Sequence, residues 1–127
     1  MIINIFLNRL IMLKVKRIYD PASEDDGYRV LIDRLWPRGV SKENANIDLW
    51  MKEIAPSTEL RKWFHHDLDK WEEFQQRYTV ELSNKKDLID QLLKLKEEYK
   101  SITFIYSAKD REKNQAIVLI EVLRKQL

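Results

Sequence analysis

The 127 residues of this chain, 44% of them hydrophobic and 35% charged, are enough for one compact domain and too few for a two-domain enzyme. The net charge of +2 is too small to require a nucleic-acid partner, and the composition is typical of a soluble globular protein. Because the sequence contains no cysteine, disulfides, thiolate metal ligands and a cysteine nucleophile are excluded.

The first eleven residues are apolar and precede a second methionine, Met12. They lack the basic start and cleavage site of a secretory signal, and they are too short for a membrane-spanning helix. Three interpretations stay open for residues 1–12: an extra strand, a docking or swapping arm, or an upstream start codon ahead of the working one. Residues 13–127 then form a single α/β domain, which we expect to be cytoplasmic and not bound to a membrane.

From Leu13 onward, short β-branched runs alternate with helical patterns, which is typical of strands joined by helical crossovers. Strands are predicted near 13–19, 28–35 and 101–106, and residues 47–50 fit either a short strand or a helical turn. Capping residues and apolar stripes predict helices at about 57–65, 69–83, 86–99 and 112–126. The last helix is so apolar that it must be covered on both sides. The pattern predicts a three-layer α/β fold, with a mostly parallel sheet and helices on both faces.

The segment 33–39 is the first candidate for a functional site, because it follows a buried strand at the sheet edge where open α/β sheets bind ligands. Arg34 and Arg38 are able to hold an oxyanion through paired hydrogen bonds, with Trp36 between them in the sequence. Asp33 would orient one arginine or act as a base. The structural alternative is that Asp33 pairs with one of these arginines and that the indole packs on the neighbouring proline.

The second candidate segment, 106–110, leaves the next buried strand and enters the last predicted helix. Backbone N–H groups at the helix start, helped by Lys109, favour an anion, with Ser107 as a further donor and Asn114 in the first turn. The alternative is that Asp110 caps the helix and Lys109 is solvated.

These two segments are expected to meet, because parallel strands bring their carboxyl ends to the same edge of a sheet. Arg34, Arg38 and Lys109 are therefore predicted to converge on one pocket, with Asp33 and Ser107 at its wall. An anion is the natural complement of three cations beside one acid.

His65 and His66 are the two histidines of the chain. Neighbouring residues of a helix point about 100° apart, so the two rings are poorly placed to chelate one ion, and we predict neither a metal site nor a cofactor. His66 is a candidate general acid or base, because histidine titrates near neutrality. Alternatively, both histidines lie at a junction between two helices and contact exposed carbonyls.

Several runs of sequence resemble the YeaO-like branch of the domain of unknown function family 488 over residues 13–127. They are Lys-Arg-Ile-Tyr-Asp-Pro at 16–21, Gly-Tyr-Arg-Val-Leu-Ile-Asp-Arg-Leu-Trp-Pro-Arg-Gly at 27–39, Ala-Pro-Ser-Thr-Glu-Leu-Arg-Lys-Trp-Phe at 55–64, His-Asp at 66–67 and Tyr-Ser-Ala-Lys-Asp at 106–110. The resemblance implies a small cytoplasmic α/β protein with no settled activity. Relatives outside this branch carry a cysteine after the last strand and a Cys-His-Arg run entering the last helix. Here Ser107 and residues 114–116 occupy those places, which argues against a thiol mechanism and leaves an arginine-centred anion site.

Two classes of function follow. The first is a protein that binds a phosphate- or carboxylate-bearing small molecule at the carboxyl edge of the sheet, with or without catalysis. The second is a module that binds nucleic acid or protein through a basic patch. Its candidate residues are Lys14, Lys16, Arg17, Lys85 and Lys86. Arginines that converge on a concave pocket favour the first class, and basic groups along one convex face favour the second.

Overall fold

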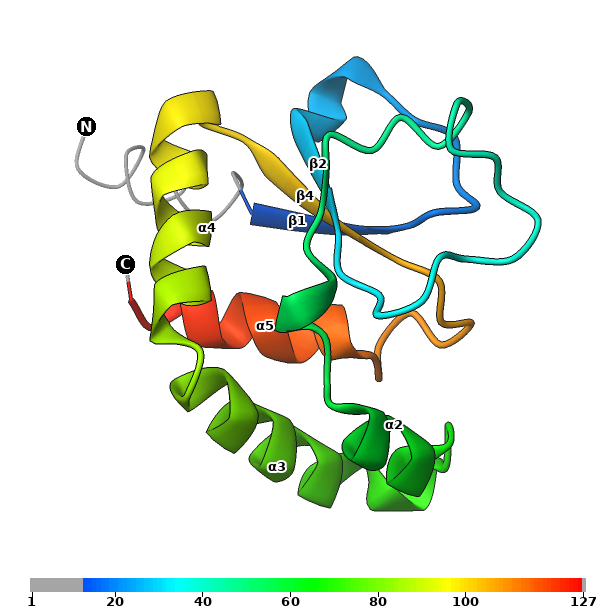
Figure 1. Ribbon diagram of the computed structural model, residues 1–127, viewed down its shortest axis with the longest axis vertical. Coiled ribbons are helices and arrows are strands. Elements are labelled where there is room, and N and C mark those ends of the chain that lie inside the picture. The colour runs from blue at the N-terminus through cyan, green and yellow to red at the C-terminus, as the bar shows by residue number, and fades with distance from the viewer. Residues whose placement is uncertain (1–12, 127) are drawn as a thin grey trace.

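The computed structural model describes residues 13–126, so the interpretations of residues 1–12 lie outside the described residues. Four parallel strands form one sheet in the order β1-β4-β2-β3 (Figure 1). The strands are β1 (Leu13–Arg17), β2 (Tyr28–Leu31), β3 (Leu49–Trp50) and β4 (Ile102–Tyr106). In the centre of the sheet, Phe104 pairs with Val15 on one side and with Val30 on the other.

The helices are α2 (Thr58–Phe64), α3 (Trp71–Ser83), α4 (Lys86–Tyr99) and α5 (Gln115–Arg124). Three short 3-10 turns accompany them, η1 (Glu24–Asp26), η2 (Lys52–Ile54) and η3 (Leu68–Lys70). The predicted α/β class and parallel sheet are therefore confirmed, and residues 49–50 are a strand. The last helix begins three residues later than predicted, because its N-cap is Asn114.

One face of the sheet carries the main hydrophobic core, to which all four helices contribute. Val30 of β2, Phe104 of β4 and Ile32, the residue that follows β2, are fully buried there, against Leu60, Tyr78, Leu92 and Leu119 from the helices. Figure 1 shows α5 lying between the strands and α3, and α5 contacts β1, β4 and α3. The prediction that this apolar helix is covered on both sides is confirmed.

The opposite face of the sheet has a smaller core made by Ile18, Leu31, Ala45 and Ile105. The layer that covers it differs from the expected helices, because it consists of the loop 32–48 and the turn η1. Two indoles help to form this layer: Trp36 packs edge-on against Trp50, with ring centroids 5.4 Å apart, and donates a hydrogen bond to the Val40 carbonyl at 2.7 Å. The two aromatic rings supply the apolar area that a helix would otherwise provide.

Candidate functional site

The loops that follow β1, β2 and β4 meet at the carboxyl edge of the sheet. Arg17, the last residue of β1, donates hydrogen bonds to the carbonyls of Ser107 and Ala108 at 3.1 and 2.8 Å. Its guanidinium lies 4.9 Å from the centre of the Tyr19 ring, and the Tyr19 hydroxyl donates to the Arg38 carbonyl at 2.9 Å. The Arg17 side chain thus lies at the carboxyl edge of the sheet, whereas it was predicted to belong to a basic patch. Its position at the end of a strand was the signal available for finding it.

Asp33 is the buried centre of this edge. One carboxylate oxygen accepts a hydrogen bond from the Gln115 amide at 2.8 Å, and the other accepts one from the Ser107 hydroxyl. Burial raises the pKa of Asp33, and the hydrogen bonds from Ser107 and then Gln115 oppose that effect. Asp33 and Ser107 are therefore brought into contact, whereas Gln115 had not been predicted. Within residues 13–126 no ion pair joins Asp33 to Arg34 or Arg38, so the predicted structural pair is wrong.

Arg34 turns toward a different segment of the chain, the residues that link η2 to α2. Its guanidinium donates to the Ala55 carbonyl at 3.0 Å and to the Pro56 carbonyl at 3.1 Å. The ammonium of Lys85, between α3 and α4, donates to the same Ala55 oxygen at 3.0 Å. Because both nitrogens lie 3.0 Å from one oxygen, they are at most 6.0 Å apart. We call these two cations the Arg34–Lys85 pair.

The Arg34–Lys85 pair carries a concentrated positive charge. Both side chains are partly buried, and neither forms an ion pair with any carboxylate of residues 13–126. Burial, with the nearby Arg34 charge, lowers the pKa of Lys85, while Glu81 and Glu53 act in the opposite direction. An oxyanion that accepts hydrogen bonds from both cations would relieve their mutual repulsion.

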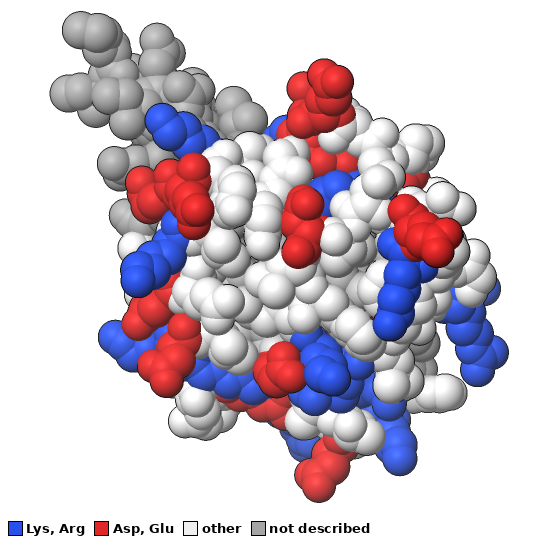
Figure 2. Space-filling view, turned by 45° about the horizontal axis from the view of Figure 1, so that its top comes forward, with Lys and Arg blue, Asp and Glu red and all other residues white. Residues whose placement is uncertain are grey.

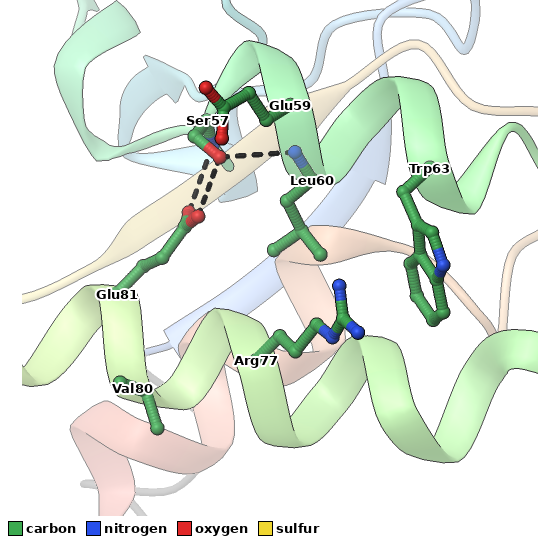
Figure 3. Close-up of a pocket in the computed structure, with 7 residues that line it drawn as sticks. All are labelled: Ser57, Glu59, Leu60, Trp63, Arg77, Val80 and Glu81. Carbon is green, nitrogen blue, oxygen red and sulfur yellow. Dashed lines mark hydrogen bonds between the residues drawn. The ribbon is translucent and has the colours of Figure 1, made fainter.

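Helix α3 fixes the segment on which the Arg34–Lys85 pair meets. The Tyr78 hydroxyl donates to the Ile54 carbonyl at 2.8 Å. The Glu81 carboxylate accepts from the backbone N–H of Ser57 at 2.8 Å and from its hydroxyl at 2.6 Å (Figure 3). Ser57 in turn caps α2 by accepting from the Leu60 N–H. The position of the Ala55 carbonyl is therefore set by rigid elements on both sides.

A shallow cavity of about 490 Å³ lies between α2 and α3, next to this segment. Figure 3 shows the Trp63 and Arg77 side chains extending toward each other across it, with the guanidinium 4.3 Å from the centre of an indole ring. Arg77 is already paired with Glu73, so its charge is balanced.

At the start of α5, two of the N–H groups expected to face an anion are engaged by a side chain of the chain itself. Asn114 is the N-cap of the helix, and its amide oxygen accepts from the N–H groups of Ala116 and Ile117 at 3.0 and 3.3 Å. The Asp110 carboxylate likewise accepts hydrogen bonds from the backbone N–H groups of residues 112 and 113, at 2.9 and 2.8 Å. The alternative prediction that Asp110 caps the helix is therefore wrong, because Asn114 is the cap. The anion site expected at this helix start stays a prediction, with two of its N–H donors already engaged.

No hydrogen bond or ion pair within residues 13–126 joins Asp33 to the side chains of the remaining predicted site residues. Arg38 and Lys109 are exposed, and their convergence on one pocket stays a prediction. His66 is exposed at the end of α2, where its φ is 57°, and no hydrogen bond within residues 13–126 connects it to Asp33 or Ser107.

Two further observations concern the described part of the chain only. Residues 13–126 contain no group of three or more histidine, aspartate or glutamate side chains placed to hold a metal ion. The helices of this part are too short or too polar to cross a membrane.

The fold and its edge define a small α/β protein with a parallel four-stranded sheet and a polar, charged carboxyl edge. The chain belongs to the inactive DUF488-N3 subclade, whose family model matches residues 12–127. It is 44% identical over 112 residues to the uncharacterized protein YeaO of Escherichia coli K12. The matched region covers 88% of this chain and 96% of that protein. It is 46% identical over 70 residues to the uncharacterized proteins Mb3100c of Mycobacterium bovis and Rv3073c of Mycobacterium tuberculosis, covering 55% of this chain and 59% of each of those. No solved structure matches the chain.

Proposed function

We propose that this protein binds a small phosphate- or carboxylate-bearing molecule at the carboxyl edge of its sheet. The observation that carries the proposal is the Arg34–Lys85 pair, whose two cations share the Ala55 carbonyl and have no carboxylate partner in the described part of the chain. A guanidinium presents several donors in a plane and an ammonium adds a point charge, a combination that suits an oxyanion.

The contacts of Ser107 argue against a serine nucleophile at this edge. Its hydroxyl donates to one oxygen of the Asp33 carboxylate, and the other oxygen is engaged by the Gln115 amide. No imidazole is hydrogen-bonded to Ser107 among residues 13–126, so the pair lacks the base of a serine nucleophile. The description of the subclade as inactive agrees with this interpretation.

Substitution of Lys85 by glutamine tests the proposal, with Lys86→Gln as the matched control, because Lys86 is the next residue and is exposed. The thermal midpoint is measured with and without millimolar phosphate at constant ionic strength. A ligand at 100 times its Kd stabilises a protein by about 2.7 kcal/mol. We expect phosphate to raise the midpoint of the wild type and of Lys86→Gln, and to have little effect on Lys85→Gln.

Two outcomes would contradict this site. An equal effect of phosphate on Lys85→Gln and the wild type would remove the Arg34–Lys85 pair from consideration. If Arg38→Ala or Lys109→Ala loses the effect instead, the anion lies between the loops after β2 and β4, as the sequence alone predicted.

Binding of nucleic acid or protein through a basic patch has less support. Lys14 donates to the Asp25 carbonyl, Lys16 pairs with Asp26 at 2.7 Å, and Arg17 is bound to two carbonyls. Figure 2 shows Lys and Arg interspersed with Asp and Glu over the face that it presents, so this face has no continuous basic surface. Nucleic-acid binding depends on many such cations being free to contact phosphates.

A further inference from the structure

We propose that Lys85 is a reactive amine, and that an aldehyde or keto acid whose anionic group lies on Arg34 forms an imine with its Nζ atom. The preference for an anionic carbonyl compound rests on the proposed function, whereas the reactivity of the amine rests on its surroundings alone.

The surroundings of Lys85 shift its protonation equilibrium toward the neutral amine, which is the nucleophilic form, relative to an exposed lysine. The side chain is partly buried, and it donates a hydrogen bond to a neutral carbonyl, that of Ala55. The guanidinium of Arg34 shares that oxygen, and a neighbouring cation disfavours a second positive charge. Two acids act in the opposite direction, Glu81 and Glu53, but the Glu81 oxygens are already engaged by Ser57.

The balance of these effects lowers the pKa of Lys85, with burial as the largest cause. A lysine activated by burial and a neighbouring cation is a known way to obtain an amine nucleophile near neutral pH. Lys86 follows it directly and is exposed, so the two amines of one dipeptide differ in their surroundings.

The proposed reaction balances without an oxidant or reductant. The lone pair of the Lys85 nitrogen attacks the carbonyl carbon, a C–N bond forms, and the carbonyl π electrons move to the oxygen, which takes up a proton. The carbinolamine then loses the hydroxyl group and the remaining nitrogen proton as water, which leaves the C=N bond. The carboxylate of the keto acid stays on Arg34 throughout.

The test is reductive trapping on the full chain with sodium cyanoborohydride, which transfers a hydride to the imine carbon. Glyoxylate is the anionic probe and acetaldehyde is the neutral one, and peptide mass spectrometry gives the extent of modification at each lysine. Each unit by which the pKa of an amine falls increases its neutral fraction about tenfold at neutral pH. We therefore expect Lys85 to be modified several times faster than Lys86 at pH 7, and the excess to shrink near pH 10.

The choice of probes separates this inference from the proposed function. Selective modification of Lys85 by glyoxylate, suppressed by phosphate, supports both. Selective modification by acetaldehyde, with no preference for glyoxylate and no stabilisation by phosphate, supports the reactive amine and contradicts the anion site. Stabilisation by phosphate, with Lys85 and Lys86 modified at equal rates, overturns the reactive amine and leaves the anion site in place.

Discussion

The Tyr78→Phe variant tests whether α3 holds the segment on which the proposed site is built. Tyr78 is fully buried, and its hydroxyl donates to the Ile54 carbonyl at 2.8 Å. The substitution keeps the ring and its packing against Phe74, where the ring centroids are 5.8 Å apart. It therefore removes one hydrogen bond and deprives the Ile54 carbonyl of this partner. An average intramolecular hydrogen bond contributes about 1 kcal/mol, and an unsatisfied buried group costs about 1–3 kcal/mol, so we expect a loss of about 1–2 kcal/mol.

Urea-induced unfolding at pH 7 measures this loss as a change in the midpoint at constant slope. The matched control is Tyr99→Phe, because Tyr99 is 47% exposed and stacks on Tyr28 through its ring, which the substitution retains. We expect the control to change stability by less than about 0.5 kcal/mol. If Tyr78→Phe unfolds at the same urea concentration as the wild type, the hydroxyl does not hold the Ile54 segment and the argument for a rigid site fails.

Three other substitutions test the edge and the core. Asn114→Ala removes the cap of α5 and should cost about 0.5–2 kcal/mol in urea unfolding, whereas Asn114→Asp keeps the acceptor and should cost less; equal stabilities would refute the cap. Asp33→Asn removes a carboxyl group whose pKa is raised in the folded state. In the wild type, this group therefore lowers the free energy of unfolding as the pH rises from its unfolded pKa, near 3.9, through its folded pKa. The stability of Asp33→Asn relative to wild type should therefore increase from pH 4 upward, and a relative decrease would reverse the assignment. Leu123→Ala opens a cavity in the buried face of α5 and should cost about 2–5 kcal/mol, with exposed Val80→Ala as the control; an unchanged thermal midpoint would place α5 outside the core.

The sequence by itself determined the parallel α/β fold and the two-sided burial of α5. Continuous apolar runs identify strands that are covered on both faces, and an apolar pattern around most of a helix leaves no side for water. It also determined that Asp33 and Ser107 meet. Each follows one of two strands, and those strands, β2 and β4, are parallel neighbours in the sheet, so the topology alone brings their ends together.

Only the tertiary structure decided how the second face of the sheet is covered and where the arginine side chains go. The loop 32–48 has no helical pattern, and its ability to replace a helix depends on how Trp36 and Trp50 pack in space. Arg34 leaves the neighbouring Asp33 and meets Lys85 on a carbonyl of a third segment. A long cationic side chain reaches acceptors several ångströms from its own backbone, so its partner is chosen by the packing of distant elements and not by its neighbours in the sequence.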